Sequence, residues 1–329
     1  MTKRYNSLAI YRIIAALAII QFHIFFITYE RDIPFEMLLS KGVQGLTALS
    51  GFLYAGKRID NGAKFVIGAT KKLLIPALVC LALMAIWNLG YFFSTGCSVN
   101  YFSLFIDSRA YNDAFLIQPG NYYYIIYIFV CYAITPLLKN KRYRRGIIIA
   151  AVLGELILSF AFGISIIVIP YLVGYILGEF SFEKYTDTKY RIKPLLLWLA
   201  IFAAAFALYS AVVLNTFGNA WILAKLHKLL LNLTSSAVGT ASFFLFISLF
   251  KGLNRFGEPK LLLYTDRLGL VIFLMNQAFM CGGMDVCAYF DSIALDTALV
   301  YLFTLGSAAL IDALLSLPAK MKEGKRAPQ

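Results

Sequence analysis

Two ionisable side chains, Arg12 and His23, lie inside the first strongly apolar run of the chain, YRIIAALAIIQFHIFF. Eleven helical steps of about 100° return almost to the same face, about 16 Å further along the axis. An imidazole, with an unperturbed pKa of about 6.5, can take up or release a proton near neutral pH. A guanidinium suits an anion or a carbonyl oxygen. This spacing predicts two polar positions at different depths of one path.

Each of these two residues also has a structural interpretation. Arg12 lies near the end of the run and could extend its guanidinium to the lipid headgroups. His23 could bond a backbone carbonyl, but it is too short to reach the headgroups from its depth. It is also the one histidine in any predicted span. These facts favour a functional role for His23 over a structural one.

The elements that must position these residues are membrane helices. Of the 329 residues, 60% are hydrophobic and 14% are charged, which is more apolar surface than a soluble core of this size can bury. The first run is too long for a signal peptide and contains an arginine, so we expect a retained helix. The sequence predicts an all-α, polytopic membrane protein with one domain over residues 1–329. Its ten expected spans are 8–29, 42–56, 73–93, 121–138, 146–162, 164–180, 195–215, 232–250, 268–286 and 298–317.

The distribution of basic residues predicts the orientation of these spans. With ten crossings and a cytoplasmic N-terminus, 24 of the 30 Lys and Arg residues lie on the cytoplasmic side. Removing the short second crossing would place the basic cluster at 139–145 outside. We therefore expect both termini in the cytoplasm. Topology accounts for the net charge of +13, so no nucleic-acid partner is implied, although a basic inner rim also suits an anionic cytosolic ligand.

Other sequence features carry less chemistry. The cysteines and histidines show no metal-binding spacing, so no metal site is predicted. No internal repeat and no nucleotide-binding glycine motif is present. Two glycine pairs, Gly42 with Gly45 and Gly174 with Gly178, indicate close packing of helices.

Several motifs resemble the acyltransferase 3 family of membrane O-acyltransferases. The most specific are the Arg12–His23 spacing and LTALSGFLY in the second span. KKLLIP, NYYYIIYIFVCYAITPLL and YLVGYILGEF in the third, fourth and sixth spans also match. The resemblance runs from about Asn6 to the end of the last span. It implies a ten-helix fold that takes acyl-CoA from the cytoplasm and acylates a carbohydrate hydroxyl, without a separate cofactor.

The chain departs from the family pattern at a few positions. Leu46 and Thr47 replace two phenylalanines before the Ser-Gly pair, and Asn276 replaces a histidine often found in the ninth span. A tryptophan of the fourth span is replaced among Tyr122, Tyr123 and Tyr124. These changes leave Arg12 and His23 untouched, but they make the acceptor and the role of the ninth helix open questions.

The candidate catalytic residues are therefore His23 and Arg12, and Arg12 is also expected to bind the donor. Three further residues are candidates for substrate binding: Ser50, Tyr123 and Glu155. Ser50, beside a glycine, is equally suited to helix packing. Glu155 could orient His23 or Arg12, and it is equally suited to bonding within the protein.

Three further polar residues receive structural interpretations. Asn276 and Gln277 suit hydrogen bonds between helices. His227 lies in WILAKLHKLLLNL, which is typical of an interfacial helix on the outer side.

The leading hypothesis is an O-acetyltransferase of a bacterial cytoplasmic membrane that acts on a surface polysaccharide or its lipid-linked precursor. One alternative is a transporter or flippase for such a glycan, because polar residues on helices also line translocation paths. Another is an acyl donor to a separate transferase, since only a short basic tail follows the last span. The outer segment 94–120 is expected to form a lid or an acceptor contact.

Overall fold

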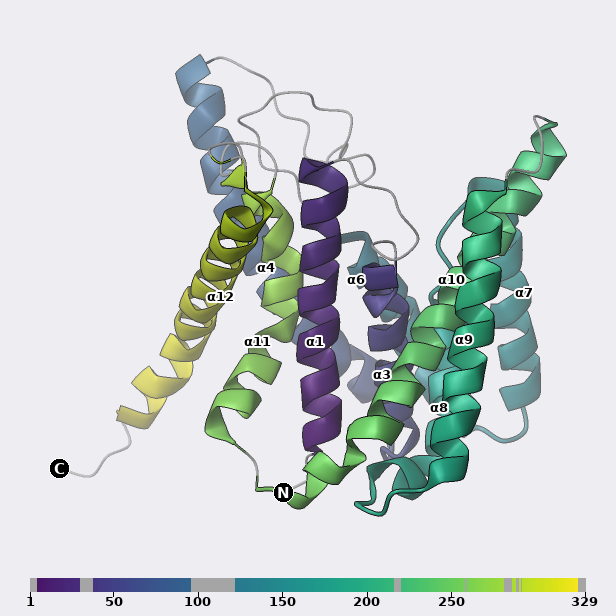
Figure 1. The fold of residues 1–329 in the computed structure, drawn as a ribbon. Coiled ribbons are helices and arrows are strands. Elements are labelled where there is room, and N and C mark those ends of the chain that lie inside the picture. The colour runs from purple at the N-terminus through teal and green to yellow at the C-terminus, as the bar shows by residue number, and fades with distance from the viewer. Residues whose placement is uncertain are drawn as a thin grey trace. The chain divides into compact units, whose positions relative to one another are not determined.

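The computed structural model describes residues 5–29, 38–95, 122–215, 220–257, 259–280, 286–287, 290 and 292–324 (Figure 1). These residues form helices joined by short connections, with no β-strand among them. The α-helices are α1 (Asn6–His23), α3 (Gly42–Ala55), α4 (Gly62–Thr95), α6 (Tyr123–Lys139), α7 (Arg144–Phe162), α8 (Val168–Thr186), α9 (Ile192–Leu214), α10 (Trp221–Phe250), α11 (Lys260–Met275) and α12 (Ile293–Gly324). A π-helix, η1 (Ile24–Thr28), follows α1, and two 3₁₀-helices, η4 (Lys251–Arg255) and η5 (Asn276–Phe279), follow α10 and α11.

The prediction of a polytopic helical protein is confirmed. Six helices in the described part of the chain are long and apolar enough to cross a membrane, namely Asn6–Phe26, Gly62–Gly90, Arg144–Phe162, Ile192–Leu214, Trp221–Arg255 and Ile293–Ser316. Every predicted span overlaps an α-helix. The number of crossings, the placement of the termini and the single domain stay predictions.

Several predicted helix ends are wrong. Helix α4 begins at Gly62 rather than at residue 73, and α10 begins at Trp221 rather than at residue 232. The segment around His227 is therefore the first part of α10 and not a separate interfacial helix. The predicted ends lie where the hydropathy falls. Lys is itself a good helix former, so the backbone hydrogen bonds of the helix continue through the basic residues.

The contacts divide the chain into two compact units. The first comprises Met1–Ile19, Asp32–Ala69 and Ile126–Asp266, and the second comprises Ile20–Arg31, Thr70–Ile125 and Arg267–Gln329. The division falls within α1, α4, α6 and α11, so each of these helices contributes to both units.

Glycine contacts bring the helices of the first unit close together, as the two glycine pairs predicted. A Cβ atom added at Gly42 would lie 2.8 Å from the carbonyl oxygen of Ala15 on α1. At Gly174 of α8 it would collide with the backbone of Ala48 on α3, and at Gly178 it would lie 2.6 Å from the carbonyl oxygen of Phe52. Helix α3 therefore packs backbone to backbone against α8, which suits helix association in lipid.

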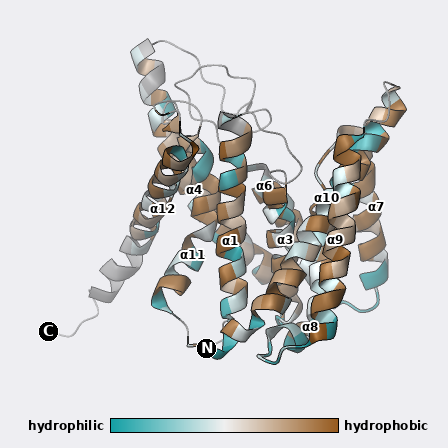
Figure 2. Cartoon of the chain, viewed as in Figure 1, coloured by the Kyte–Doolittle hydropathy of each residue, from teal (hydrophilic) through white to brown (hydrophobic). Residues whose placement is uncertain are grey.

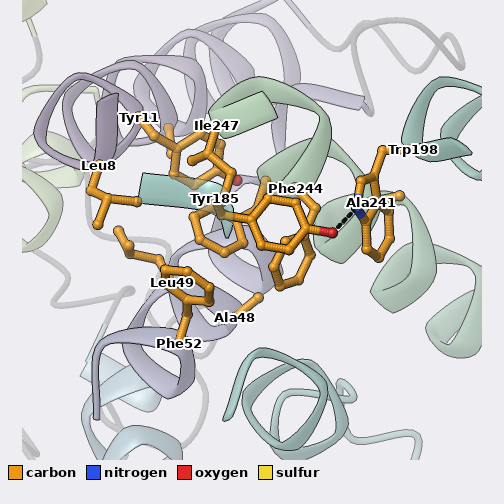
Figure 3. Packing of buried hydrophobic residues seen from close by; sticks show 12 residues of the cluster. Leu8, Tyr11, Ala48, Leu49, Phe52, Tyr185, Trp198, Ala241, Phe244 and Ile247 are labelled. Carbon is orange, nitrogen blue, oxygen red and sulfur yellow. Dashed lines mark hydrogen bonds between the residues drawn. The ribbon is translucent and has the colours of Figure 1, made fainter. Parts of the chain in front are cut away.

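An aromatic core fills the space beside these contacts (Figure 3). Trp198 of α9 stacks on Phe244 of α10 with ring centroids 4.7 Å apart. Its indole N–H donates to the Tyr185 hydroxyl at 2.6 Å. The indole thus satisfies its single donor while burying a large apolar surface, and it ties α8 to α9.

The outer faces of α7 and α9 are apolar along most of their length (Figure 2). Leu153 and Ile157 of α7 and Leu197 and Leu208 of α9 each expose more than half of their surface. Exposed apolar side chains on several turns of one helix suit a lipid environment better than water.

The start of α1 is fixed by polar contacts within the first unit. The Asn6 side-chain amide donates to the carbonyl oxygens of Leu253 and Gly257, each at 3.1 Å. The backbone N–H of Ser7 donates to Asn254 Oδ1 at 2.9 Å. One terminus of α1 is therefore attached to η4 and the turn after it, which orients the helix that carries both candidate catalytic residues.

Candidate functional site

Helix α1 runs without a break from Asn6 to His23, as the spacing argument requires. Arg12 belongs to the first compact unit and His23 to the second. Each residue has a specific polar partner within its own unit.

Arg12 forms an ion pair with Asp266 of α11. Its Nη1 donates to Asp266 Oδ1 at 2.5 Å, and the Arg12 side chain is about one-third exposed. This bond occupies one of the five N–H donors of a guanidinium, so others are left for a ligand. The pair keeps the cation in place on α1 and offsets part of its charge.

Aromatic and basic groups of the first unit gather around Tyr54. Arg12 interacts electrostatically with Tyr54 of α3. The Tyr54 ring packs edge-on against Phe65 and Tyr132, with centroids 5.2 and 5.0 Å apart. The Lys57 ammonium lies 5.5 Å from the Tyr54 ring and 5.4 Å from the Phe65 ring. We call Arg12, Tyr54, Lys57 and Phe65 the basic–aromatic cluster. It combines cations with ring faces, the groups that bind phosphates and a base.

His23 is hydrogen-bonded to Asn276 at the start of η5. His23 Nδ1 and Asn276 Oδ1 are 3.1 Å apart. The π-helix η1 begins at the next residue, Ile24, and single π-turns in α-helices are often found at functional sites. An imidazole held through one ring nitrogen can exchange a proton through the other.

Ser50 and Glu155 make contacts that account for them without a substrate. The Ser50 hydroxyl donates to the carbonyl oxygen of Leu46 in its own helix at 3.0 Å. The buried carboxylate of Glu155 accepts three backbone N–H bonds at the start of α8, from Ile167 and Val168 at 2.5 Å and from Ile169 at 2.7 Å. A carboxylate at a helix N-terminus satisfies orphan donors and the helix dipole.

The other predicted site features are placed only in part. Tyr123 begins α6, but its side chain lies outside the described residues. So does the predicted lid from residue 96 onward. Asn276 bonds between helices, as predicted, and the substrate-binding assignments of Ser50, Tyr123 and Glu155 stay predictions.

Sequence reasoning missed the two partners that hold the candidate catalytic residues. Asp266 was not singled out, although an acid just before a predicted span is a signal that it pairs with a cation. Asn276 was assigned to hydrogen bonding between helices, but its partner is 253 residues away in the chain.

Within the described ranges, no three His, Cys, Asp or Glu residues gather as a metal site would require.

Helices long and apolar enough to cross a membrane indicate a multipass helical membrane protein. The chain matches the acyltransferase 3 family, described as an acyltransferase domain, over residues 5–315, and it belongs to that family. No curated protein and no solved structure matches the chain significantly.

Proposed function

We propose that this chain is a membrane O-acyltransferase that moves an acyl group, expected to be acetyl, from cytoplasmic acyl-CoA to a glycan hydroxyl. The acceptor would be a surface or cell-wall polysaccharide or its lipid-linked precursor in a bacterial cytoplasmic membrane. Family membership supports acyl transfer in general. The observation that carries the proposal for this chain is His23, which is bonded to Asn276 through Nδ1 and has no hydrogen-bond partner at Nε2 among the described residues.

In the direct route, His23 takes the proton of the acceptor hydroxyl as its oxygen attacks the thioester carbonyl. The carbon–sulfur bond then breaks, and the coenzyme A thiolate leaves and receives a proton. In the two-step route, the imidazole attacks the thioester carbonyl, the carbon–sulfur bond breaks and the coenzyme A thiolate leaves. The acceptor hydroxyl then attacks the acyl-imidazole, the carbon–nitrogen bond breaks, and the hydroxyl proton ends on the coenzyme A thiol. Both routes need a neutral ring nitrogen with a free lone pair.

The basic–aromatic cluster is the proposed binding region for the donor. Coenzyme A carries phosphates and an adenine at one end and the thioester at the other. Arg12 and Lys57 supply cations for the phosphates, and the Tyr54 and Phe65 rings supply faces for the base.

This arrangement depends on a cytoplasmic start of α1, which the basic residues predict. Reporter fusions after Arg58, within residues 142–145 and after Gln329 should all report the cytoplasm. A fusion within residues 94–120 should report the outside. An external signal from residues 142–145 would contradict the topology.

The decisive experiment uses the purified protein in lipid nanodiscs with labelled acetyl-CoA and candidate glycans. Wild type should transfer label, and His23→Ala should lower turnover by about 10²-fold or more while acetyl-CoA binding persists. His227→Ala is the matched control, because it removes the other histidine of the chain. Equal rates for wild type and His23→Ala would contradict the proposed site.

The same preparation distinguishes the alternatives. A transporter would move a glycan across vesicles without consuming acetyl-CoA. An acyl donor would transfer label only after a partner transferase is added. Inverted repeats, which are common in transporters, are absent from the sequence, so we favour the enzyme.

A further inference from the structure

The orientation of the Asn276 side chain is fixed by its own helix. Its Nδ2 donates to the carbonyl oxygen of Phe273 at 2.7 Å and is 3.4 Å from that of Ile272. Asn276 is completely buried. Because carbonyl oxygens only accept, the amide nitrogen must face them, and the amide oxygen Oδ1 must face His23.

This orientation determines which nitrogen of His23 carries the proton. Oδ1 of an amide is an acceptor only, so the ring nitrogen 3.1 Å away, Nδ1, must be the donor. A neutral imidazole has one N–H, and therefore Nε2 keeps the lone pair.

We propose that Asn276 is a positioning residue that holds His23 in the Nδ1–H tautomer and thereby presents Nε2 as the proton acceptor. The catalytic consequence rests on the proposed function, whereas the tautomer itself does not. In the described part of the chain, His23 contacts the Phe22 ring and the Asn276 amide, and no charged side chain hydrogen-bonds to it. A neutral partner leaves the imidazole neutral, as a base requires.

The tautomer can be measured without any activity assay. The chain has two histidines, so His227→Gln leaves His23 as the single histidine for ¹⁵N labelling. In nanodiscs at pH 8, the ring spectrum should show a protonated Nδ1 and an unprotonated Nε2. Adding Asn276→Leu should move the population toward the Nε2–H form. A predominant Nε2–H form with Asn276 present, or an unchanged spectrum in Asn276→Leu, would overturn the proposal.

Kinetics test the positioning role through two substitutions at one site. Asn276→Leu removes the acceptor and should lower kcat about 10- to 100-fold with a nearly unchanged KM for acetyl-CoA. Asn276→Asp keeps an acceptor but adds a negative charge that favours the imidazolium ion. It should restore much of kcat at high pH and move the acidic limb of the pH–rate profile up by about one pH unit or more.

A structural asparagine provides the matched control. Asn232 of α10 donates to Ser159 Oγ and to the carbonyl oxygen of Ile164, each at 3.0 Å. Asn232→Leu should lower thermal stability without changing the pH profile. If Asn276→Leu behaves like Asn232→Leu, or if Asn276→Asp leaves the acidic limb in place, Asn276 is merely structural. If the spectra are as expected but wild type transfers no acyl group, the proposed function fails and the tautomer assignment holds.

Discussion

Replacing Glu155 by glutamine separates its observed contacts from its predicted substrate role. The Glu155 carboxylate accepts three N–H bonds at the start of α8, two through Oε1 and one through Oε2. A glutamine oxygen can still accept two of these bonds. Its amide nitrogen, however, would face the N–H of Ile169, and two donors cannot bond.

The loss of stability follows from these contacts. One buried N–H without a partner costs about 1–3 kcal/mol. Loss of the negative charge at the helix N-terminus adds up to about 2 kcal/mol in a buried setting. We therefore expect Glu155→Gln to destabilise the protein by about 2–4 kcal/mol. At about 2–4 °C per kcal/mol, the melting temperature should fall by about 5 °C or more.

A thiol-reactive fluorophore can follow this unfolding, because Cys80 and Cys131 are completely buried free cysteines. Cys97 and Cys281, which lie outside the described residues, are first replaced by serine, so that the signal comes from thiols whose burial is known. Glu183→Gln is the matched control, since Glu183 is an exposed carboxylate of the same helix, and it should change stability by less than about 0.5 kcal/mol.

Activity then decides between the two roles of Glu155. Well below the melting temperature, Glu155→Gln should keep kcat and the KM for acetyl-CoA within about twofold per folded molecule, because the carboxylate is bonded to α8. An unchanged melting temperature with a strongly raised KM would refute this reasoning and restore a substrate-binding role.

Three further predictions concern other parts of the first unit. Arg12→Ala should raise the KM for acetyl-CoA about 10- to 100-fold, and Arg12→Lys should rescue it only in part, because an ammonium lacks the guanidinium fork. A wild-type KM for acetyl-CoA in both variants would exclude Arg12 from donor binding. Burial raises the pKa of Asp187, but the adjacent cations, above all Lys251 at 2.8 Å, outweigh it and hold the pKa below its usual value. This carboxylate therefore stabilises the folded state above about pH 4. The melting temperatures of wild type and Asp187→Asn should differ most above this pH and converge on further acidification. A constant difference down to pH 3 would count against the ion pair. Gly174→Val should prevent α8 from reaching the α3 backbone and lower the yield of folded protein in detergent, and a normal yield and melting temperature would argue against this packing.

The helices could be predicted because apolar runs of sufficient length leave few alternatives in a membrane protein. Gly174 and Gly178 likewise indicated a close approach of two helices before any partner was known. The start of α4 at Gly62 could not be predicted in the same way. The apolar run ends at three basic residues, Lys64, Lys71 and Lys72, but the helix does not. The backbone hydrogen bonds of a helix do not depend on hydropathy.

The candidate site was predictable in its residue types but not in its pairings. The cost of an intramembrane charge singled out Arg12 and His23 from one short stretch. Their partners come from α11 and η5, more than 250 residues away, and many polar residues of the chain would be chemically suitable. For Glu155, the apolar run placed the carboxylate in a helix, but the N-terminus that it caps belongs to another element.

The two partners differ in charge, and the difference fits the two proposed roles. Arg12 must be held in place to bind an anionic donor, and the Asp266 carboxylate does this while occupying a single donor of the guanidinium. A carboxylate beside His23 would favour the imidazolium ion, which has no lone pair to offer a hydroxyl. Asn276 instead provides an uncharged acceptor, which orients the ring and leaves it neutral. A purely structural histidine could bond equally well to a donor or to an acceptor. A histidine that takes up a proton at Nε2 needs an acceptor at Nδ1, and Asn276 provides that acceptor.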